Sequence, residues 1–524
     1  MKKFALFLFL VTLGPMTACS DDDTKKGTPI PDFELPEMKW TTYDWEITKT
    51  TVSGMFELDG RIPAGATLEV NCYFGENEDA LKPIAHTVTD KWNYKYSTER
   101  LTGLEPGTTY LMRIEYGSKE AKGGGQQKSL TKQVKTMSDY SGFQVDQTVT
   151  PVNHKIEWAT EKEKPTGLKS ISPANIFAAY PRLVHVDNGT IACVYHGGTI
   201  GTPFLAIYMQ TSTDDGATWS EARELLSVNN PKYAEVYKRF INPEILRLQN
   251  GSFLLSVTAI GAVETNENCH TLALISEDGC KTWSEPVIVG RGRSWEPMVV
   301  QLPNGELELL VSSEAQWWQV TNPLPQEILC ARSTDNGRTW TKYIRACYSP
   351  DRRDGMPSAV VLQGNKGVLF SIEVINHNGY GSPSLVHRAL DGEWDPIPWR
   401  GQASDGRWHI QMALNNGSTD GAAPYTIQLT TGEVVVMAQV NPKNSIWQTA
   451  YPRIAICDNT GHGWSDASKS TPVGAMPNNE GFYYGSLFQK DDNTIWLAAT
   501  HCSYSGTMAE WSQIKFLKGT IVRK

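Results

Sequence analysis

Two glutamates in the second half of the chain have the residue type and the setting for two-carboxylate chemistry. Glu296 stands between Trp295 and Pro297, and Glu373 ends the apolar run of residues 367–372. A carboxylate buried at the end of an apolar strand is unfavourable unless it has a partner. Two carboxyl groups facing one cavity supply an acid/base and a nucleophile or second base, which are the groups that hydrolysis of a glycosidic bond needs.

Each glutamate also has a structural interpretation. An ion pair with a nearby arginine, such as Arg293 or Arg353, would satisfy a buried carboxylate without any catalytic role. The catalytic interpretation is favoured because independent sequence repeats place both glutamates on one pocket.

A turn preceded by an apolar strand recurs about every sixty residues. The six turns are 187–189, 249–251, 303–305, 364–367, 430–432 and 491–493. Asn-Gly between apolar runs is typical of a β-hairpin. Upstream of the turns lie Pro181, Pro243, Pro297, Pro357, Pro424 and, in the last unit, Gly485. Six such units predict an all-β fold, a six-bladed β-propeller over residues 170–524.

A third repeat has the pattern S-x-D-x-G-x-T-W. Residues 212–219 and 333–340 fit it, residues 276–283 fit it with the glycine one place early, and 457–464 and 391–394 are remnants. These segments resemble the Asp-boxes of the sialidase-like propeller superfamily. We expect them to be structural turns and not calcium sites.

The innermost strand of each propeller blade starts at the mouth of the central channel, and the repeated proline marks that start. The predicted pocket residues beside it are Tyr180, Arg182, Arg239, Asn242, Glu244, Arg293, Trp295, Glu296, Arg353, Asp354, Met356, Tyr425, Tyr483 and Tyr484. The second strand of each blade returns to the same mouth and adds Tyr195, His196, Glu373 and His501.

Trp295-Glu296-Pro297, then Gly355-Met356-Pro357, then Glu373 resemble the exo-arabinanase family of glycoside hydrolases, family 93. The resemblance implies that Glu296 and Glu373 are the catalytic pair, with Glu373 favoured as nucleophile and Glu296 as acid/base. Residues expected to hold or shape the sugar are Tyr180, Arg182, His196, Asn242, Glu244, Trp295, Arg353, Asp354 and Tyr484. An exo-acting hydrolase that trims a terminal sugar, with arabinofuranose as one candidate, needs neither a cofactor nor a metal.

Two other functions remain open. A sialidase would use Arg182 for the sugar carboxylate and Tyr484 as nucleophile. However, Met356 stands where the partner Glu is expected, and Glu373 stands where a second Arg is expected. The other alternative is a non-catalytic glycan-binding lipoprotein. A platform at Trp317 and Trp318, or a loop carrying His409, could also contact a glycan.

Residues 39–137 are predicted to form a fibronectin type III-like β-sandwich. The segment 104–113 resembles the L-x-P-x-T-x-Y motif of that family, in which the Tyr bonds back to the backbone. A carbohydrate-binding module is the rival interpretation. Residues 138–169 are predicted to be a linker.

The N-terminus reads as a lipoprotein signal. Residues 1–19 have two lysines, a short apolar run and Met16-Thr17-Ala18-Cys19, which resembles a bacterial lipobox. Cys19 would carry the lipid, and residues 20–38 would be a tether. The acidic run after Cys19 resembles the surface-export tag of Bacteroidetes lipoproteins. We therefore expect an outer-membrane or cell-surface lipoprotein of a Gram-negative bacterium, with a periplasm-facing position as an alternative.

The composition of the chain indicates which classes of binding partner to expect. The 524 residues carry 57 acidic and 48 basic side chains, a net charge of −9, which argues against nucleic acid. No internal run is long enough to span a membrane, so membrane contact is expected through the lipid alone. The expected partner is a polysaccharide or other glycan, and the expected state is a monomer. The eight cysteines after Cys19 show no metal spacing and read mainly as core residues, with one or two disulfides possible.

Overall fold

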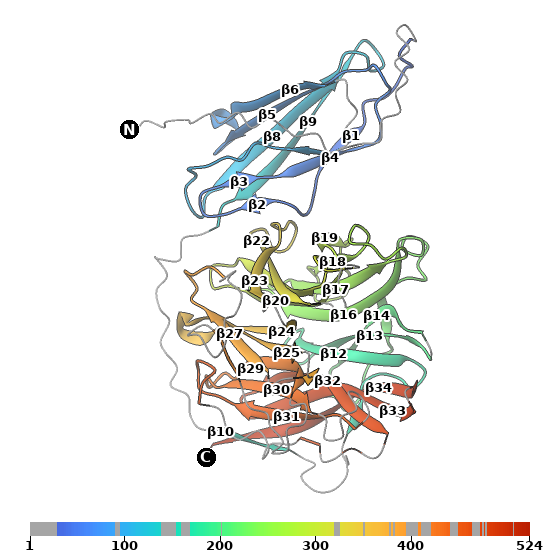
Figure 1. Ribbon diagram of the computed structural model, residues 1–524, viewed down its shortest axis with the longest axis vertical. Coiled ribbons are helices and arrows are strands. Elements are labelled where there is room, and N and C mark those ends of the chain that lie inside the picture. The colour runs from blue at the N-terminus through green and yellow to red at the C-terminus, as the bar shows by residue number, and fades with distance from the viewer. Residues whose placement is uncertain are drawn as a thin grey trace.

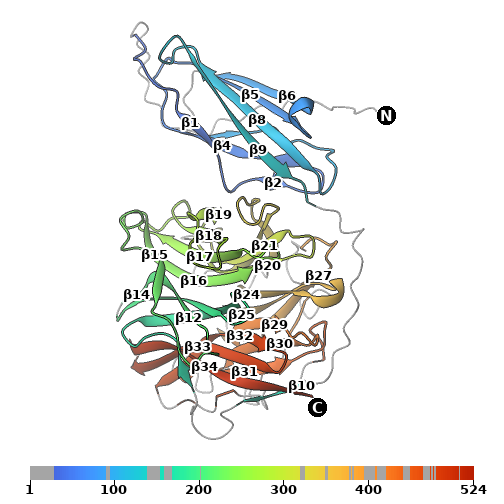
Figure 2. The ribbon, with the colours of Figure 1, turned by 180° about the vertical axis from the view of Figure 1, so that it is seen from behind.

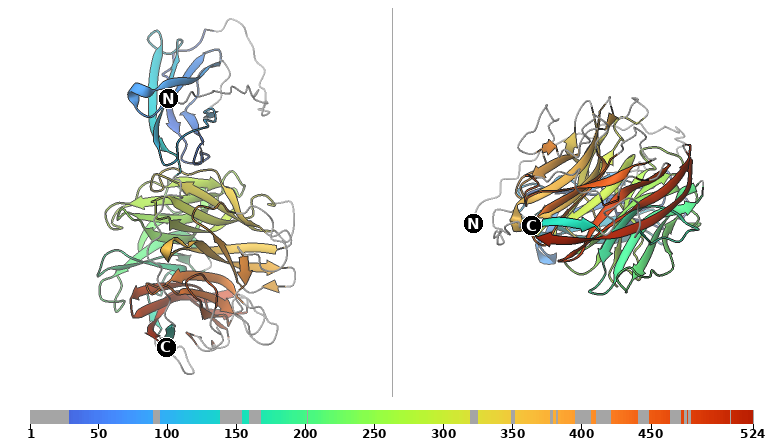
Figure 3. Two further views of the ribbon diagram at one scale, coloured as in Figure 1. Left: turned by 90° about the vertical axis from the view of Figure 1, so that its left-hand side faces the viewer. Right: turned by 90° about the horizontal axis from the view of Figure 1, so that it is seen from below.

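The computed structural model describes residues 29–89, 95–137, 154–158, 168–200, 202–318, 325–348, 352–376, 379–380, 383–394, 407–409, 421–440, 449–463, 472–473, 476, 479–506 and 508–523. The fold of this part is all-β, with two short 3₁₀ turns at Glu78–Ala80 and Gln363–Asn365. A small sandwich and a larger ring of sheets lie end to end along the long axis (Figure 1, Figure 3). The predicted signal segment and Cys19 lie outside the described residues.

The small part consists of two antiparallel sheets and a short hairpin. One sheet has the order β1 (Glu37–Trp40), β4 (Met55–Asp59), β7 (Lys95–Ser97). The other has the order β6 (Lys82–Thr89), β5 (Leu68–Gly75), β8 (Thr109–Ser118), β9 (Gln126–Lys135). The hairpin is β2 (Glu46–Ile47) with β3 (Val52–Ser53). Along β5 every second side chain is buried, as expected for a sheet with one face on a core.

Tyr110 makes the backbone contact predicted for it. Its hydroxyl accepts a hydrogen bond from the N–H of Glu105 at 3.0 Å, and its ring stacks on Phe74 with centroids 4.9 Å apart. The predicted tether is partly folded: Leu35 and Met38 are buried in the core of the sandwich. An apolar pair next to Pro36 can pack where a fully polar tether could not.

The larger part consists, within the described residues, of six sheets that follow one another along the chain (Figure 1, Figure 2). The first sheet has β12 (Phe177–His185), β13 (Ile191–Thr199), β14 (Thr202–Ser212) and β15 (Arg223–Ser227). The second has β16 (Tyr237–Arg247), β17 (Phe253–Gly261), β18 (His270–Ser276) and β19 (Val287–Arg291). The third has β20 (Ser294–Gln301), β21 (Leu307–Ser313), β22 (Glu327–Ser333) and β23 (Ile344–Tyr348).

The remaining three sheets are less regular. The fourth has β24 (Arg352–Leu362), β25 (Gly367–Asn376), β27 (Ser384–Arg388) and β28 (Arg407–His409), with β26 (Gly379–Tyr380) on β25. The fifth has β29 (Ala422–Gln428), β30 (Val434–Val440) and β31 (Tyr451–Ile456). The sixth has β32 (Glu480–Asp491), β33 (Thr494–Ser505), β34 (Met508–Arg523), β10 (His154–Trp158) and β11 (Lys169–Ser170).

The sheets close into a ring, the arrangement of a β-propeller. The first strands contact each other in the cycle β12, β16, β20, β24, β29, β32 and back to β12. The buried apolar clusters lie between neighbouring sheets, for example Phe253 and Leu255 against Val194 of the first sheet. Residues 154–158, predicted as linker, instead pair antiparallel with β34, so the sixth sheet combines strands from before and after the other five.

Three turns share one hydrogen-bond pattern. In the first, Ser212 donates to Asp214 at 2.9 Å and accepts from the Gly216 N–H, while Asp214 accepts from the Thr218 N–H. The same bonds recur in the turns that begin at Ser276 and Ser333. These aspartate oxygens accept from the turn itself, which fits the structural role predicted for them.

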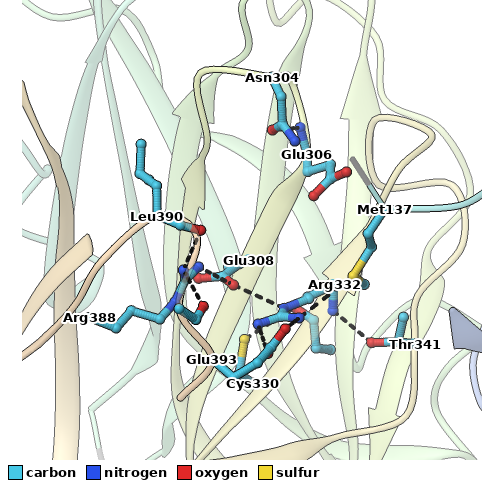
Figure 4. A network of polar contacts seen from close by, with 12 residues as sticks. Met137, Asn304, Glu306, Glu308, Cys330, Arg332, Thr341, Arg388, Leu390 and Glu393 are labelled. Carbon is cyan, nitrogen blue, oxygen red and sulfur yellow. Dashed lines mark hydrogen bonds and ion pairs between the residues drawn. The ribbon is translucent and has the colours of Figure 1, made fainter. Parts of the chain in front are cut away.

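The sandwich rests on the third of these turns. The Trp340 N–H donates to the carbonyl of Thr42 at 2.9 Å, and the Lys342 N–H donates to the carbonyl of Trp45 at 2.8 Å. Trp45 is fully buried. Beside this contact, Glu308 accepts from Arg332 at 3.0 Å and from Arg388 of the fourth sheet at 2.5 Å (Figure 4).

The eight cysteines after Cys19 are all buried and unpaired, so no disulfide is formed among them. No helix of the described chain is long and apolar enough to cross a bilayer.

Candidate active site

A β-bulge recurs in the first strand of every sheet in the ring. In β12, for example, the register shifts between Ala179 and Arg182, so that Tyr180 and Pro181 together face one residue of β13. The five other shifts lie at the equivalent positions of β16, β20, β24, β29 and β32. A bulge re-aims a side chain, and here it does so once per sheet.

The first residue of each bulge has a left-handed backbone. The six residues and their φ angles are Tyr180 (65°), Asn242 (51°), Glu296 (49°), Met356 (50°), Ala423 (46°) and Tyr484 (50°). They precede the five repeated prolines and Gly485. A left-handed non-glycine residue is uncommon, and such strain is typical of functional sites. Four of the six pack against one another, so the side chains meet at the axis of the ring.

A second set of residues holds these bulges. The backbone N–H of a bulge residue donates to a side chain on the second strand of the preceding sheet. The acceptors are His196 for Asn242 (3.1 Å), Ser312 for Met356 (2.8 Å), Glu373 for Ala423 (3.0 Å), Gln439 for Tyr484 (2.9 Å) and Thr500 for Tyr180 (3.0 Å). Glu373 therefore has a structural bond through Oε2.

Glu296 is poised as an acid. It is one of the bulge residues and keeps part of its surface open. Burial and the nearby charges of Glu373 and Glu314 raise its pKa to about 8, against the opposing effects of Ser312 and Arg353. A carboxyl group with this pKa holds its proton at neutral pH and can donate it.

Glu373 has a different environment. Burial raises the pKa of this carboxyl, but the Ala423 N–H and the positive charge of Arg353 both act to lower it. These two groups favour the ionised form. The pair thus has the asymmetry that an acid and a nucleophile or base require. Neither carboxyl is in an ion pair with Arg293, which instead binds Glu264 and Glu314.

Arg182 and Glu244 are bound to each other. Arg182 Nε donates to Glu244 Oε2 at 2.7 Å, and both side chains are at least nine-tenths buried. The guanidinium also lies over the rings of Tyr180 and Tyr425, at 3.9 and 4.7 Å from their centroids. Both residues were expected to contact sugar. In the structure they form a neutral buried pair beneath the ring of bulge residues.

Two other expected sugar ligands are similarly occupied. Asp354 is fully buried and accepts two hydrogen bonds from Arg407, each 3.0 Å long. Arg353 donates to Glu314 at 2.9 Å. Asp354 therefore stabilises the fourth sheet, whereas Arg353 acts on the two catalytic candidates by its charge.

A cavity of about 480 Å³ opens beside Glu296. Eight of the predicted pocket residues line it: Tyr180, His196, Arg239, Asn242, Trp295, Glu296, Tyr483 and Tyr484. Glu373 is not among the described lining residues. Trp295 is held by Arg293, whose guanidinium lies 4.7 Å from its ring and 3.8 Å from that of Trp318. Trp318 thus supports the site from behind, while Trp317 stacks on Tyr348 with centroids 5.3 Å apart.

Several lining residues have no counterpart in the sequence prediction. Phe177, Ile200, Phe204, Cys502, Tyr504 and Ser512 all border the cavity. They lie outside the positions that the repeated turn and proline mark, and Cys502 and Ser512 lie within β33 and β34. One signal in the sequence could have indicated this wall. Ile200 lies just after Gly197-Gly198, at the hairpin end of the strand, where an apolar residue is unexpected. The side chain of His409 lies outside the described residues, as does Trp464.

Known proteins resemble this chain in structure and not in sequence. No protein-family model matches the chain. No characterised protein sequence matches it either. A protein of unknown function from Dyadobacter fermentans has a similar structure, with a TM-score of 0.51 and 14% identity over 69% of this chain and 99% of that one.

Two enzymes are more distant. An α-L-arabinofuranosidase from Fusarium graminearum gives a TM-score of 0.48 and 19% identity over 69% of this chain and 98% of its own. A Hadza microbial sialidase gives 0.44 and 10% over 94% and 98%. At such identities a likeness concerns the fold alone.

Proposed function

We propose that this chain is an exo-acting glycoside hydrolase that removes terminal sugars from a polysaccharide, with Glu296 and Glu373 as the catalytic pair. The observation that carries the proposal is the position of the two carboxyls in adjacent sheets. Glu296 is one of the bulge residues of the ring, and Glu373 lies on the strand of the fourth sheet that supports the bulge at Ala423. Each is close enough to influence the same neighbouring group, Tyr180, whose pKa both raise.

Glu296 is assigned as the acid/base and Glu373 as the nucleophile. The protonated Glu296 gives its proton to the glycosidic oxygen as the bond to the anomeric carbon breaks. The ionised Glu373 attacks that carbon, and water then releases the sugar. If Glu373 instead activates water directly, the anomeric configuration inverts, so analysis of the product configuration separates the two routes.

A neutral terminal sugar fits this site better than a sialic acid. A sialidase would use Arg182 for the sugar carboxylate, and this arginine is already paired with Glu244. Arabinofuranose is our first candidate, on the resemblance to the exo-arabinanase family. A purely glycan-binding role is the remaining alternative, and it predicts no turnover.

The proposal also covers the propeller, the sandwich domain and the membrane anchor. The six sheets are taken as the blades of a six-bladed propeller, their shared turns as Asp-boxes, and the sandwich as a fibronectin type III-like spacer, which the Tyr110 contact supports. Cys19 would anchor the chain as a lipoprotein in the outer membrane or on the cell surface. Fractionation of cells that express wild type or Cys19→Ala tests this anchoring.

Glu296→Gln and Glu373→Gln test the catalytic pair on a panel of neutral polysaccharides and aryl glycosides. Loss of acid/base or nucleophilic chemistry should lower kcat by about 10²- to 10⁴-fold. Glu296→Gln should retain more activity on aryl glycosides, because a good leaving group needs no proton, whereas Glu373→Gln should lose both. Glu277→Gln, in an exposed turn, is the matched control. Absence of turnover by wild type with retained glycan binding would favour the binding-protein alternative.

A further inference from the structure

The cavity beside Glu296 has an apolar wall. Its side is built from Phe177, Ile200 and Phe204 of the first sheet and from Tyr504 and Ala509 of the sixth. Phe204 meets the His196 ring edge-on at 5.3 Å and packs with Trp295 against a small apolar cluster. These side chains offer ring faces and aliphatic groups, which suit an apolar ligand better than a polyhydroxylated one.

The polar atoms of the sixth-sheet wall are bonded to one another. Ser512 donates to the carbonyl of Ala178 at 2.6 Å, Cys502 donates to Ser512 at 3.1 Å, and the Tyr483 hydroxyl donates to Cys502 at 3.0 Å. Tyr483 and Tyr504 also share a hydrogen bond between their hydroxyls. This chain of bonds satisfies the hydroxyls internally, so the wall presents little hydrogen-bonding capacity to a ligand.

Apart from the sixth-sheet wall, the polar groups that line the cavity lie at its axial end, with the exception of the exposed Arg239, whose guanidinium lies 5.6 Å from the centre of the Phe204 ring. His196 accepts the Asn242 N–H through Nδ1, and burial lowers its pKa to about 3, so the ring is neutral and carries its proton on Nε2. Asn242 is more than nine-tenths buried, and its Oδ1 has no partner. Together with Glu296, these residues can recognise one or two oxygen atoms of a ligand, close to the proton donor.

The position of the cavity indicates which part of a substrate it holds. A general acid contacts the leaving-group oxygen, whereas a nucleophile contacts the anomeric carbon. Glu296 lines the cavity, and Glu373 is absent from its described lining. The space therefore lies on the leaving-group side of the pair.

We propose that this cavity is a leaving-group subsite that selects an apolar aglycone, such as an aryl group. The proposal rests on the proposed function, because it takes Glu296 as the acid, and it narrows the substrate from polysaccharides in general to glycosides whose leaving group is apolar. When the glycosidic bond breaks, the proton of Glu296 passes to the glycosidic oxygen, and the aglycone leaves as a neutral alcohol or phenol into this space. Ile200, which is 73% exposed at the rim, gains apolar contact when the subsite is filled.

The test measures binding without turnover. 4-Methylumbelliferone, an apolar leaving group without a sugar, is titrated by equilibrium dialysis against wild type, Phe204→Ser and Ile200→Ser. Each variant should weaken binding by about fivefold or more, because one buried methylene group already contributes close to fourfold. Val88→Ser, at another exposed apolar position on the sandwich, is the matched control and should bind as wild type does.

A second probe separates the leaving group from the sugar's own substituents. It is methyl tri-O-methyl-arabinofuranoside, whose apolar groups are on the sugar. Variant-sensitive binding of 4-methylumbelliferone supports the proposal. Binding of the methylated sugar alone, binding that the two variants leave unchanged, or no binding of either probe would overturn it. Ile200→Ser keeps the test valid if Phe204→Ser is unstable, as its Tm will show. Because no turnover is measured, failure here is distinct from loss of activity in Glu296→Gln.

Discussion

At the scale of single residues, the site depends on backbone strain at Glu296. Its φ of 49° is costly for a side chain with a Cβ, and the following Pro297 restricts the strand further. The bulge turns the carboxyl out of the regular alternation of β20 and toward the axis. Burial there makes the charged form unfavourable, which keeps the acid protonated.

Activity should fall as pH rises through about 8, because Glu296 then loses the proton that it must donate. On the acidic side activity should fall as Glu373 takes up a proton, at a pH above the ordinary range of a glutamate because its pKa is raised. The measurement is kcat/KM against pH on a substrate that needs protonation. An aryl glycoside with a good leaving group is the control substrate. With it, the decrease of kcat/KM at alkaline pH should be much smaller. A wild-type profile still rising at pH 9 would contradict the assignment.

The same group links pH to stability. Between its ordinary pKa of 4.5 and about 8, Glu296 binds more proton in the folded than in the unfolded chain, so its contribution to stability is complete below 4.5 and is lost as pH rises through 8. Glu296→Gln lacks this dependence. The Tm of Glu296→Gln minus the Tm of wild type should therefore increase as the pH is raised from 5 to 9.

At the scale of elements, neighbouring sheets are joined by buried polar pairs as well as by apolar packing. Arg182 on β12 and Glu244 on β16 form one such pair, with Tyr425 of β29 beside them. A pair of this kind is costly to break on one side, because the remaining charge is left buried without a partner.

Arg182→Met should therefore lower the free energy of unfolding by about 3–5 kcal/mol. Arg182→Met with Glu244→Met should recover most of that loss, since no uncompensated charge remains. Urea denaturation of the two variants measures the difference. If the double variant is as unstable as the single one, the loss comes from packing on Tyr180 and Tyr425 and not from the unpaired charge.

At the scale of the whole molecule, direct contacts join the sandwich to the ring. Tyr43 is buried against Arg291 of β19, whose guanidinium lies 4.6 Å from its ring and bonds its hydroxyl. Thr334 donates to the carbonyl of Lys135 at 3.1 Å, and Trp45 bridges to Thr341. These contacts join the sandwich to the end of the ring that it faces in Figure 2.

Tyr43→Ala should loosen this docking while leaving both cores intact. In differential scanning calorimetry we expect the transitions of the sandwich and the ring to move apart, relative to wild type. Tyr73→Ala, on the outer face of the sandwich, is the control and should give the wild-type trace. Unchanged transitions in Tyr43→Ala would show that the interface contributes little to cooperativity.

The sequence by itself determined the all-β class, the turns, and the positions where bulge residues meet. These features depend on local chemistry: Asn-Gly turns, a proline after five of the six bulge residues, and Ser and Asp side chains that bond their own turns. His196, Asn242, Trp295, Glu296 and Tyr484 were predicted to face one pocket for this reason, and they do.

Only the tertiary structure decided which polar groups are free. Arg182, Asp354 and Glu244 sit close to the mouth in sequence terms, yet each is occupied by a partner from another strand. The apolar wall around Phe204 and Tyr504 likewise joins the first and sixth sheets, which are far apart in the chain. Periodicity states which way a side chain points from its own strand. Whether it meets a charge, a ring or open space depends on the packing of sheets against each other, because those contacts form between residues with no fixed separation in sequence.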